Sequence, residues 1–147
     1  MAIEIGQEAP DFTLPDENNE EVTLSALRGT PVVLVFYFSD FSGICTDELC
    51  VIRDDHSAWI EKGATVLGIS RDTRFVHAAF KQHEGIPFTL LADMKGEVAR
   101  AYDTWNDALG AAERLTAVID RDGKIAYLLK NPIPDARDHS LVEAAIN

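Results

Sequence analysis

The stretch VVLVFYF, residues 32–38, is the longest apolar run in this chain of 147 residues. A strand that reads as continuous apolar sequence is covered on both faces, so this stretch is predicted to lie in the middle of a sheet. Two further apolar runs, ATVLGIS at 64–70 and PFTLLAD at 87–93, predict two more buried strands. The residues between these runs, about 43–62 and 72–83, have helical spacing. This alternation predicts an α/β fold.

Shorter elements flank this β-α-β-α-β core. They are a hairpin at 11–27 around Asn18-Asn19, a short helix at 96–105, a hairpin at 115–129 that turns at Asp122-Gly123, and a last helix at 140–146. Asp72 is expected to cap the helix at 72–83. Together the elements predict one domain, residues 1–147, in which a central mixed β-sheet is flanked by helices on both faces and preceded by an N-terminal β-hairpin.

The composition argues against a nucleic-acid-binding protein, a membrane protein and a disulfide-rich scaffold. The net charge of −12 argues against binding to nucleic acid, which needs clustered Lys and Arg. No apolar stretch approaches the roughly 18–20 residues of a membrane span, and the N-terminus lacks the basic and apolar segments of a signal peptide. We therefore expect a cytoplasmic protein. Two cysteines are too few for a disulfide scaffold, so their chemistry is expected to be redox rather than architectural.

Both cysteines lie in the stretch FYFSDFSGICTDELC, residues 36–50, where the central strand is expected to give way to a helix. On a helix that begins at Gly43, Cys45 shares an apolar face with Leu49 and Ile52, whereas Cys50 lies about 140° away on a polar face. Five residues also rise about 7.5 Å, so the Cα separation exceeds the roughly 7 Å limit for a disulfide. The two thiols cannot bond while this helix is intact. A metal site is also disfavoured, because thiols on different faces without a nearby His pair do not form a tetrahedral site.

A reactive Cys45 needs a positive charge nearby. Lowering the pKa of a thiol from about 8.5 to about 6 requires roughly 3.4 kcal/mol. A helix N-terminus supplies about 0.3–1 kcal/mol and at most about 2, while Asp47 and Glu48 in the same turn oppose a thiolate. Arg53 lies about 12 Å further up the helix and is out of reach. The cation must therefore come from another segment of the chain.

The order and spacing of several motifs resemble the peroxiredoxins, and the resemblance covers nearly the whole chain. The motifs are GQEAPDFTL at 6–14, the cysteine stretch followed by CVIRDD at 50–55, VLGIS at 66–70, PFTLLAD at 87–93, AYDTW at 101–105 and RLTAVIDRDGKI at 114–125. The spacing of Cys45 and Cys50 is similar to that of the bacterioferritin comigratory protein, or peroxiredoxin Q, subgroup. The resemblance implies a thioredoxin-like fold and a thiol peroxidase with neither a metal nor an organic cofactor.

The resemblance also implies roles for individual residues. Cys45 matches the peroxidatic cysteine, whose thiolate attacks a peroxide and becomes a sulfenic acid, and Cys50 matches the resolving cysteine that forms an intramolecular disulfide with it. Arg114 matches the active-site arginine and would supply the missing cation. Glu48 matches the acidic residue that holds this arginine, and Ser42 the hydroxyl residue that binds peroxide. The implied substrates are hydrogen peroxide and small organic hydroperoxides, with thioredoxin or a similar dithiol protein as reductant, and the implied state is a monomer or weak dimer.

One residue departs from the family pattern in a way that bears on catalysis. The motif of the family reads Pro-x-x-x-Thr-x-x-Cys, whereas this chain has Phe38, Ser42 and Cys45 at these positions. Serine keeps the hydroxyl group. Phe38 can shield the thiol from water, but it cannot fix the backbone angle φ as a proline ring does. The substitution is expected to affect catalytic efficiency more than the type of reaction.

Other interpretations stay open at the level of sequence. Arg114 taken alone would be a surface arginine at a strand edge, and Glu48 an ordinary carboxylate in the first turn of a helix. Thiol–disulfide oxidoreductases share the fold, although they use a C-x-x-C motif. Loss of the proline would suit a redox-sensing or interaction module with low peroxidase activity. The expected chemistry needs none of the four histidines, His56, His77, His83 and His139.

Overall fold

The computed structural model describes residues 3–41, 52–53, 57–131 and 140–146. Its strands are β1 (Thr13–Pro15), β2 (Glu21–Thr23), β3 (Val32–Phe36), β4 (Thr65–Ser70), β5 (Thr89–Ala92), β6 (Trp105–Asn106), β7 (Ala111–Ala112), β8 (Arg114–Ile119) and β9 (Ile125–Asn131). Its named helices are the 3-10 helix η1 (Leu24–Leu27), α2 (Arg74–Glu84), α3 (Glu97–Ala101) and α4 (Ser140–Ala145). The helix predicted at about 43–62 is helical at residues 52–53 and 57–61, and its other residues up to 56 lie outside the described parts. Among the residues described, no helix is both long and apolar enough to cross a membrane.

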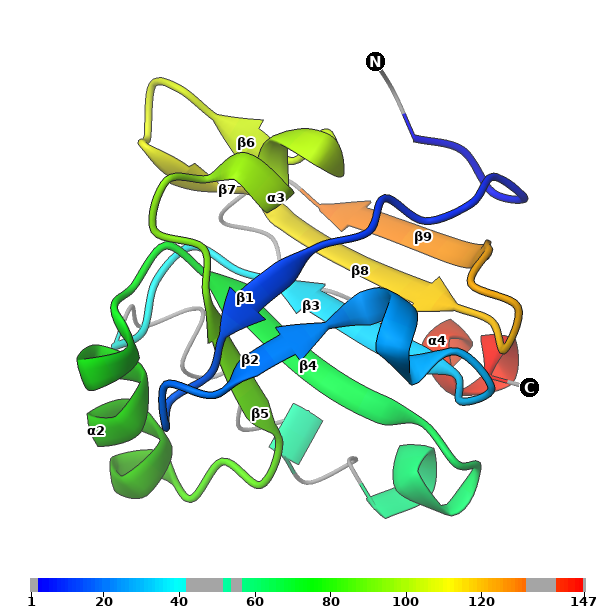
Figure 1. The fold of residues 1–147 in the computed structure, drawn as a ribbon, viewed down its shortest axis with the longest axis horizontal. Helices are drawn as coiled ribbons and strands as arrows, with labels where there is room; N and C mark the ends of the chain where they lie inside the picture. Colours follow the sequence, from blue (N-terminus) through cyan, green and yellow to red (C-terminus); the bar gives the residue numbers. More distant parts are fainter. Residues whose placement is uncertain (1–2, 42–51, 54–56, 132–139, 147) are drawn as a thin grey trace.

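Five strands form the central sheet in the order β5-β4-β3-β8-β9 (Figure 1). β3 pairs in parallel with β4 and antiparallel with β8. β5 extends the parallel half of the sheet, and β9 extends the antiparallel half. All five residues of β3 are buried. The predicted mixed sheet is therefore confirmed, with the longest apolar run of the sequence at its middle.

Each face of the sheet has its own hydrophobic core, because successive side chains of a strand point to opposite faces. The core on one face includes Phe12, Leu24, Val98, Ala99 and Tyr102, which come from the N-terminal region, η1 and the α3 region. The core on the other face includes Ile52, Trp59, Phe80, Val142 and Ile146, which come from the helical residues after the cysteines and from the α2 and α4 regions. Figure 1 views the sheet from the side of the β1-β2 hairpin. The prediction of helices on both faces and an N-terminal hairpin is confirmed.

Asp120 fixes the turn between β8 and β9. One oxygen of its carboxylate accepts hydrogen bonds from the N–H groups of Asp122 and Lys124, each at 2.9 Å. Gly123 has φ +85°, in the left-handed region that favours glycine. The predicted turn at Asp122-Gly123 is confirmed, and it returns the chain so that β9 lies antiparallel to β8.

Three details differ from the sequence predictions. β3 ends at Phe36 rather than at residue 38, although the N–H of Tyr37 still donates to the Ile69 carbonyl at 3.1 Å. The small hairpin β6-β7 follows α3, and the sequence pattern does not reveal it because each of its strands has only two residues. Thr73, not Asp72, caps α2, since its hydroxyl oxygen accepts the N–H of Val76 at 3.3 Å. The prediction for Asp72 is wrong because its carboxylate serves other donors, described below.

Asp93, directly after β5, holds the beginning of α3. Its two carboxylate oxygens accept hydrogen bonds from the N–H groups of Val98 at 3.2 Å and Ala99 at 2.9 Å. Burial raises the pKa of Asp93 above its ordinary value of 3.8, and this effect outweighs the hydrogen bonds that lower it. A pKa that is raised in the folded state means that stability is greatest below 3.8 and is lost as the pH rises through the raised value.

We expect Asp93→Asn to lower the free energy of unfolding by about 1–3 kcal/mol, because an amide offers an acceptor on one side only. The advantage of the parent should shrink as the pH rises from about 4 towards neutrality, since only the parent must ionise a buried carboxyl group. Urea unfolding of both proteins at a series of pH values measures this difference. A difference that stays constant or grows with pH would contradict the assignment.

Candidate active site

Four of the predicted site residues, Ser42, Cys45, Glu48 and Cys50, lie in the segment 42–51, outside the described residues. The structure describes the chain that leads into this segment, as far as Phe41. It also describes Arg114, the fifth predicted residue, which comes from a different strand. The roles of the four stay predictions, while their entry point and the proposed cation can be examined directly.

Arg114 is the first residue of β8 and is completely buried, with 0% of its surface exposed. The next residue, Leu115, pairs with Phe36, the last residue of β3, so Arg114 lies level with the point where β3 ends. Alternation along the strand places Arg114 on the same sheet face as Val118, the face that α2 covers. A guanidinium keeps its positive charge in proteins, so β8 brings a buried cation to the carboxyl end of β3. The interpretation of Arg114 as a surface arginine is wrong.

The β6-β7 hairpin anchors the residue that precedes Arg114. The N–H of Glu113 donates to the Thr104 carbonyl at 2.7 Å, and the hydroxyl of Thr104 donates back to the Glu113 carbonyl at 2.9 Å. The side-chain amide of Asn106 also donates to the Glu113 carboxylate at 3.1 Å. These contacts fix the point at which β8 begins, and hence the position of the buried arginine.

Phe38 is half-buried and packs against the core on the α2 face of the sheet. The guanidinium carbon of Arg71 lies 5.9 Å from the centroid of its ring, within the range of a cation–π contact. Phe38 therefore covers apolar surface at the entry to the cysteine segment, in line with a shielding role. Its side chain leaves φ unrestrained, so any rigidity of this backbone must come from other groups.

A hydrogen-bonded network follows directly after β3. The hydroxyl of Tyr37 donates to the Asp40 carboxylate at 2.6 Å, and the second oxygen of this carboxylate lies 2.6 Å from Nδ1 of His77. Nε2 of His77 lies 2.9 Å from the carbonyl oxygen of Leu91. The three side chains are buried among the residues of the α2 face. Burial, followed by the negative charge of Asp40, raises the pKa of Tyr37 well above its usual value, so Tyr37 stays a phenol and a donor.

Asp72 joins this network to the backbone of the loop. One oxygen of its carboxylate accepts the N–H of Asp40 at 2.8 Å and the hydroxyl of Ser70 at 2.5 Å. Its other oxygen lies 3.3 Å from the hydroxyl of Ser39. These donors explain why Asp72 does not cap α2.

Asp40, Asp72 and His77 are also the residues best suited to a metal ion within the described parts of the chain, since one ligand atom from each lies within 4.8 Å of the others. The ligand nitrogen of His77 and the nearest oxygens of both carboxylates already have partners at 2.5–2.8 Å. We therefore interpret the three residues as a hydrogen-bonded network rather than a metal site. Sequence reasoning missed them; the available signals were a tyrosine directly after an apolar strand, and a histidine three residues before Phe80 on the buried side of α2.

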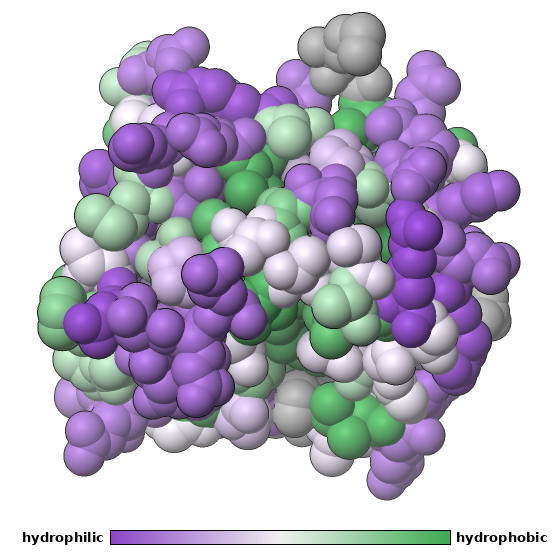
Figure 2. Space-filling model, in the orientation of Figure 1, coloured by the Kyte–Doolittle hydropathy of each residue, from purple (hydrophilic) through white to green (hydrophobic). Residues whose placement is uncertain are grey.

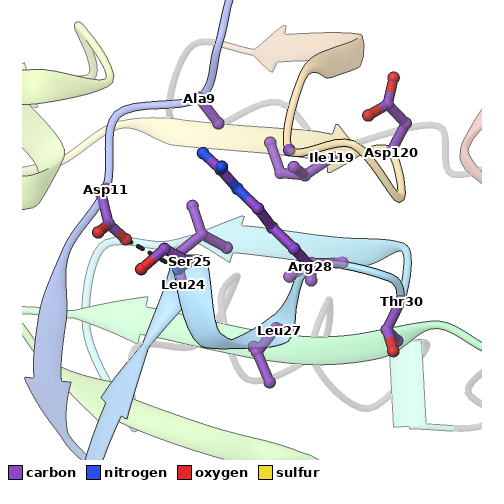
Figure 3. Close-up of a pocket in the computed structure, with 11 residues that line it drawn as sticks. Ala9, Asp11, Leu24, Ser25, Leu27, Arg28, Thr30, Ile119 and Asp120 are labelled. Carbon is purple, nitrogen blue, oxygen red and sulfur yellow. Dashed lines mark hydrogen bonds between the residues drawn. The ribbon is translucent and has the colours of Figure 1, made fainter.

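A shallow pocket lies at the opposite end of the same two strands. Its lining includes Val32, where β3 begins, and Ile119, where β8 ends. Figure 3 shows the side chain of Arg28 extending across it, and the carboxylate of Asp11 accepting a hydrogen bond from the N–H of Ser25 at 2.8 Å. The pocket is therefore separated from Arg114 by the length of β8, and we do not assign the cysteine chemistry to it.

The face of the molecule on the side of the β1-β2 hairpin is mostly hydrophilic. Figure 2 shows hydrophilic side chains over most of the visible face, with apolar side chains exposed between them in a central band.

Comparisons with known proteins agree with the geometry. Residues 5–128 match the model of the AhpC/TSA family. The chain is 39% identical over 132 residues to a protein of Bacillus subtilis named peroxiredoxin Bcp. The aligned region covers 85% of this chain and 83% of that protein. It is also 39% identical over 127 residues to the chloroplastic peroxiredoxin Q of Suaeda salsa, across 86% of this chain and 59% of that protein.

Solved structures resemble the fold over almost its entire length. Peroxidoxin BcpB from Mycobacterium tuberculosis matches with a TM-score of 0.86 and 31% identity, over 97% of this chain and 94% of that one. The reduced 2-Cys peroxiredoxin of Plasmodium vivax matches with a TM-score of 0.88 and 28% identity, over 97% of this chain and 79% of that one.

Proposed function

Since the chain belongs to the AhpC/TSA family of peroxiredoxins, we propose that it reduces peroxides through a Cys45 sulfenic acid and an intramolecular disulfide between Cys45 and Cys50. It is a thiol peroxidase with the thioredoxin-like fold of that family. The family implies a peroxide as substrate and a thiol as reductant. The division of labour between the two cysteines is our proposal.

The proposed reaction has three balanced steps. The thiolate of Cys45 attacks the terminal oxygen of the peroxide, the O–O bond breaks, and the departing oxygen takes up a proton as water or an alcohol, leaving Cys45 as a sulfenic acid. The thiol of Cys50 then attacks the Cys45 sulfur, so that an S–S bond forms and water leaves. A dithiol protein reduces this disulfide by thiol–disulfide exchange and is itself oxidised.

One observation carries the proposal most strongly. Arg114 is fully buried and lies level with Phe36, the end of β3. The segment that carries both cysteines begins six residues after Phe36, at Ser42. The thiolate of Cys45 needs a cation from another part of the chain, and we propose that Arg114 is this cation. The hydroxyl of Ser42 and backbone N–H groups are further donors of the kind that stabilise charge developing on a departing oxygen. Glu48 remains the proposed partner that orients the arginine.

Time-resolved intact mass tests the division of roles. Reduced protein and a Cys50→Ser variant each receive one equivalent of hydrogen peroxide. We expect the parent to lose two hydrogens within seconds and the variant to gain one oxygen, because without Cys50 the sulfenic acid has no partner. A variant that forms no sulfenic acid, or a parent oxidised only at the rate of a free thiol, would contradict the proposal and favour the redox-sensing alternative.

The reductant, the oligomeric state and the location are finer parts of the proposal. We propose thioredoxin or a similar dithiol protein as the reductant, a monomer as the working unit and the cytoplasm as the compartment. The plant relatives are named chloroplastic, whereas the Bacillus subtilis relative carries no such word in its name. Reduction of the oxidised protein by thioredoxin, followed at several protein concentrations, tests the first two parts together.

A further inference from the structure

Hydrogen bonds to Tyr37, His77 and Asp72 hold Asp40 in place. Both oxygens of its carboxylate have a partner at 2.6 Å, and its backbone N–H donates to Asp72 at 2.8 Å. The partners come from the end of β3, from α2 and from the turn after β4. Asp40 is thereby tied to three segments that are distant in the sequence, and a fully satisfied buried network of this kind is rigid.

The two ring nitrogens of His77 have different partners. Nε2 faces a backbone carbonyl, which can only accept, so Nε2 carries a proton. Nδ1 lies 2.6 Å from an Asp40 oxygen, so a hydrogen bond joins these two groups. His77 is therefore a bridge with a hydrogen bond at each ring nitrogen, one to the loop and one to β5.

The residue after Asp40 has a backbone conformation that needs support. Phe41 has φ +63°, a left-handed conformation that is strained for a bulky side chain. Its ring packs edge-on against Phe80, with centroids 5.0 Å apart, and against His83 at 5.9 Å. The network on one side of Phe41 and the ring contacts with α2 on the other hold the chain in this conformation.

We infer that Asp40 and His77 are positioning residues for Cys45, which restrain the backbone that enters the cysteine segment in a chain that has Phe38 where a proline would restrain it. Asp40 lies two residues after Phe38 and five before Cys45. The inference rests on the proposed function, because it assigns the network a task in the reaction of Cys45. Neither residue touches the peroxide in this account; both act through the backbone at residues 39–41.

Two substitutions of His77 separate positioning from general stability. The amide nitrogen of an asparagine can take the place of Nδ1 and donate to Asp40, while that of a glutamine can take the place of Nε2 and donate to Leu91. In a Cys50→Ser background, we expect His77→Gln to slow the oxidation of Cys45 by hydrogen peroxide about tenfold or more, and His77→Asn to stay within about threefold of the parent. Each variant loses one buried hydrogen bond, and the free energy of unfolding should fall more in His77→Gln, whose lost partner is the Asp40 carboxylate, than in His77→Asn, whose lost partner is a carbonyl.

If the network has only a general structural role, the two substitutions should not differ in their effect on the rate of Cys45. If both variants react at the parent rate, or if both slow down equally, the inference is wrong. Rapid-quench mass spectrometry of the sulfenic acid gives the rates, and urea unfolding gives the stabilities.

Tyr37→Phe and Tyr102→Phe form a second pair in case the His77 variants do not fold. Each substitution removes one buried hydroxyl. That of Tyr37 donates to Asp40 at 2.6 Å, and that of Tyr102 donates to the Pro10 carbonyl at 2.7 Å. We expect only Tyr37→Phe to slow Cys45, and equal rates for the pair would overturn the inference.

Alkylation keeps this test independent of peroxidase activity. Iodoacetamide reacts with Cys45, the only cysteine in the Cys50→Ser background, without any peroxide. If the parent fails to consume peroxide faster than a free thiol, the proposed function fails. A difference between His77→Gln and His77→Asn in the alkylation rate would still support the positioning role, and equal rates would remove it.

Discussion

Replacing Cys45 with serine is expected to reduce peroxide consumption by about three orders of magnitude or more, to the background of a protein without an activated thiol. The expected loss is this large because the sulfur is the group that forms a bond to oxygen, and a serine hydroxyl cannot be oxidised in the same way. Stopped-flow measurement of peroxide loss against reduced protein, in excess over peroxide, gives the second-order rate constant directly.

Cys50→Ser is the matched control, because it changes the same atom at the chain's other cysteine. Its first oxidation step should keep the rate of the parent, while turnover with a dithiol reductant should slow, since no intramolecular disulfide forms. If instead Cys45→Ser retained the parent rate and Cys50→Ser lost it, the assigned roles would be reversed. If neither substitution changed the rate, the proposed chemistry would fail altogether.

Arg114→Met is expected to slow the oxidation of Cys45 about 10- to 100-fold, because a hydrogen bond to a charged group is worth about 1.5–3 kcal/mol. Methionine is unbranched and flexible and can fill much of the same buried space, so the loss should report the charge more than the packing. The second-order rate constant with hydrogen peroxide measures the effect, and circular dichroism with urea unfolding confirms that the variant is folded.

Arg114→Lys provides the control for charge. Lysine keeps the positive charge but lacks the planar fork of the guanidinium, so we expect an intermediate rate between those of Arg114→Met and the parent. Equal rates for lysine and methionine would mean that the geometry of the guanidinium matters more than its charge. A methionine variant as fast as the parent would remove Arg114 from the site.

Much of the fold follows from local patterns that the structure confirms. The apolar run at 32–38 is typical of a strand covered on both faces, and Asp122-Gly123 is typical of a tight turn between two strands. The length of β3 could not be read from the sequence, because the aromatic residues Tyr37 and Phe38 continue the run past Phe36, where the strand ends. The β6-β7 hairpin escaped for a different reason, since two residues are too few for a periodic pattern. The organisation of residues 1–147 as one domain stays a prediction.

The candidate site was less predictable, because its parts come from distant segments. A cation for Cys45 was required by the energetics of the thiolate, but only the family resemblance singled out Arg114, and only the structure revealed that it is buried. In the sequence, the three residues of the network look like ordinary polar residues. Asp72 lies 32 positions after Asp40, and His77 lies 37 positions after it. Their network depends on how α2 packs on the sheet, which no local pattern contains.

The fluorescence of the two tryptophans, Trp59 and Trp105, can report on the conformation of the protein. Trp59, on the helical residues after the cysteine segment, is 2% exposed, whereas Trp105 in β6 is half-buried with the guanidinium of Arg100 4.7 Å from its ring. An indole enclosed by hydrocarbon emits at shorter wavelength than one that meets water, so the two residues contribute at different ends of the emission band. Trp59 follows Cys50 by nine residues. In a Trp105→Phe background, the colour of the remaining emission would track this helix through a redox cycle without any added label.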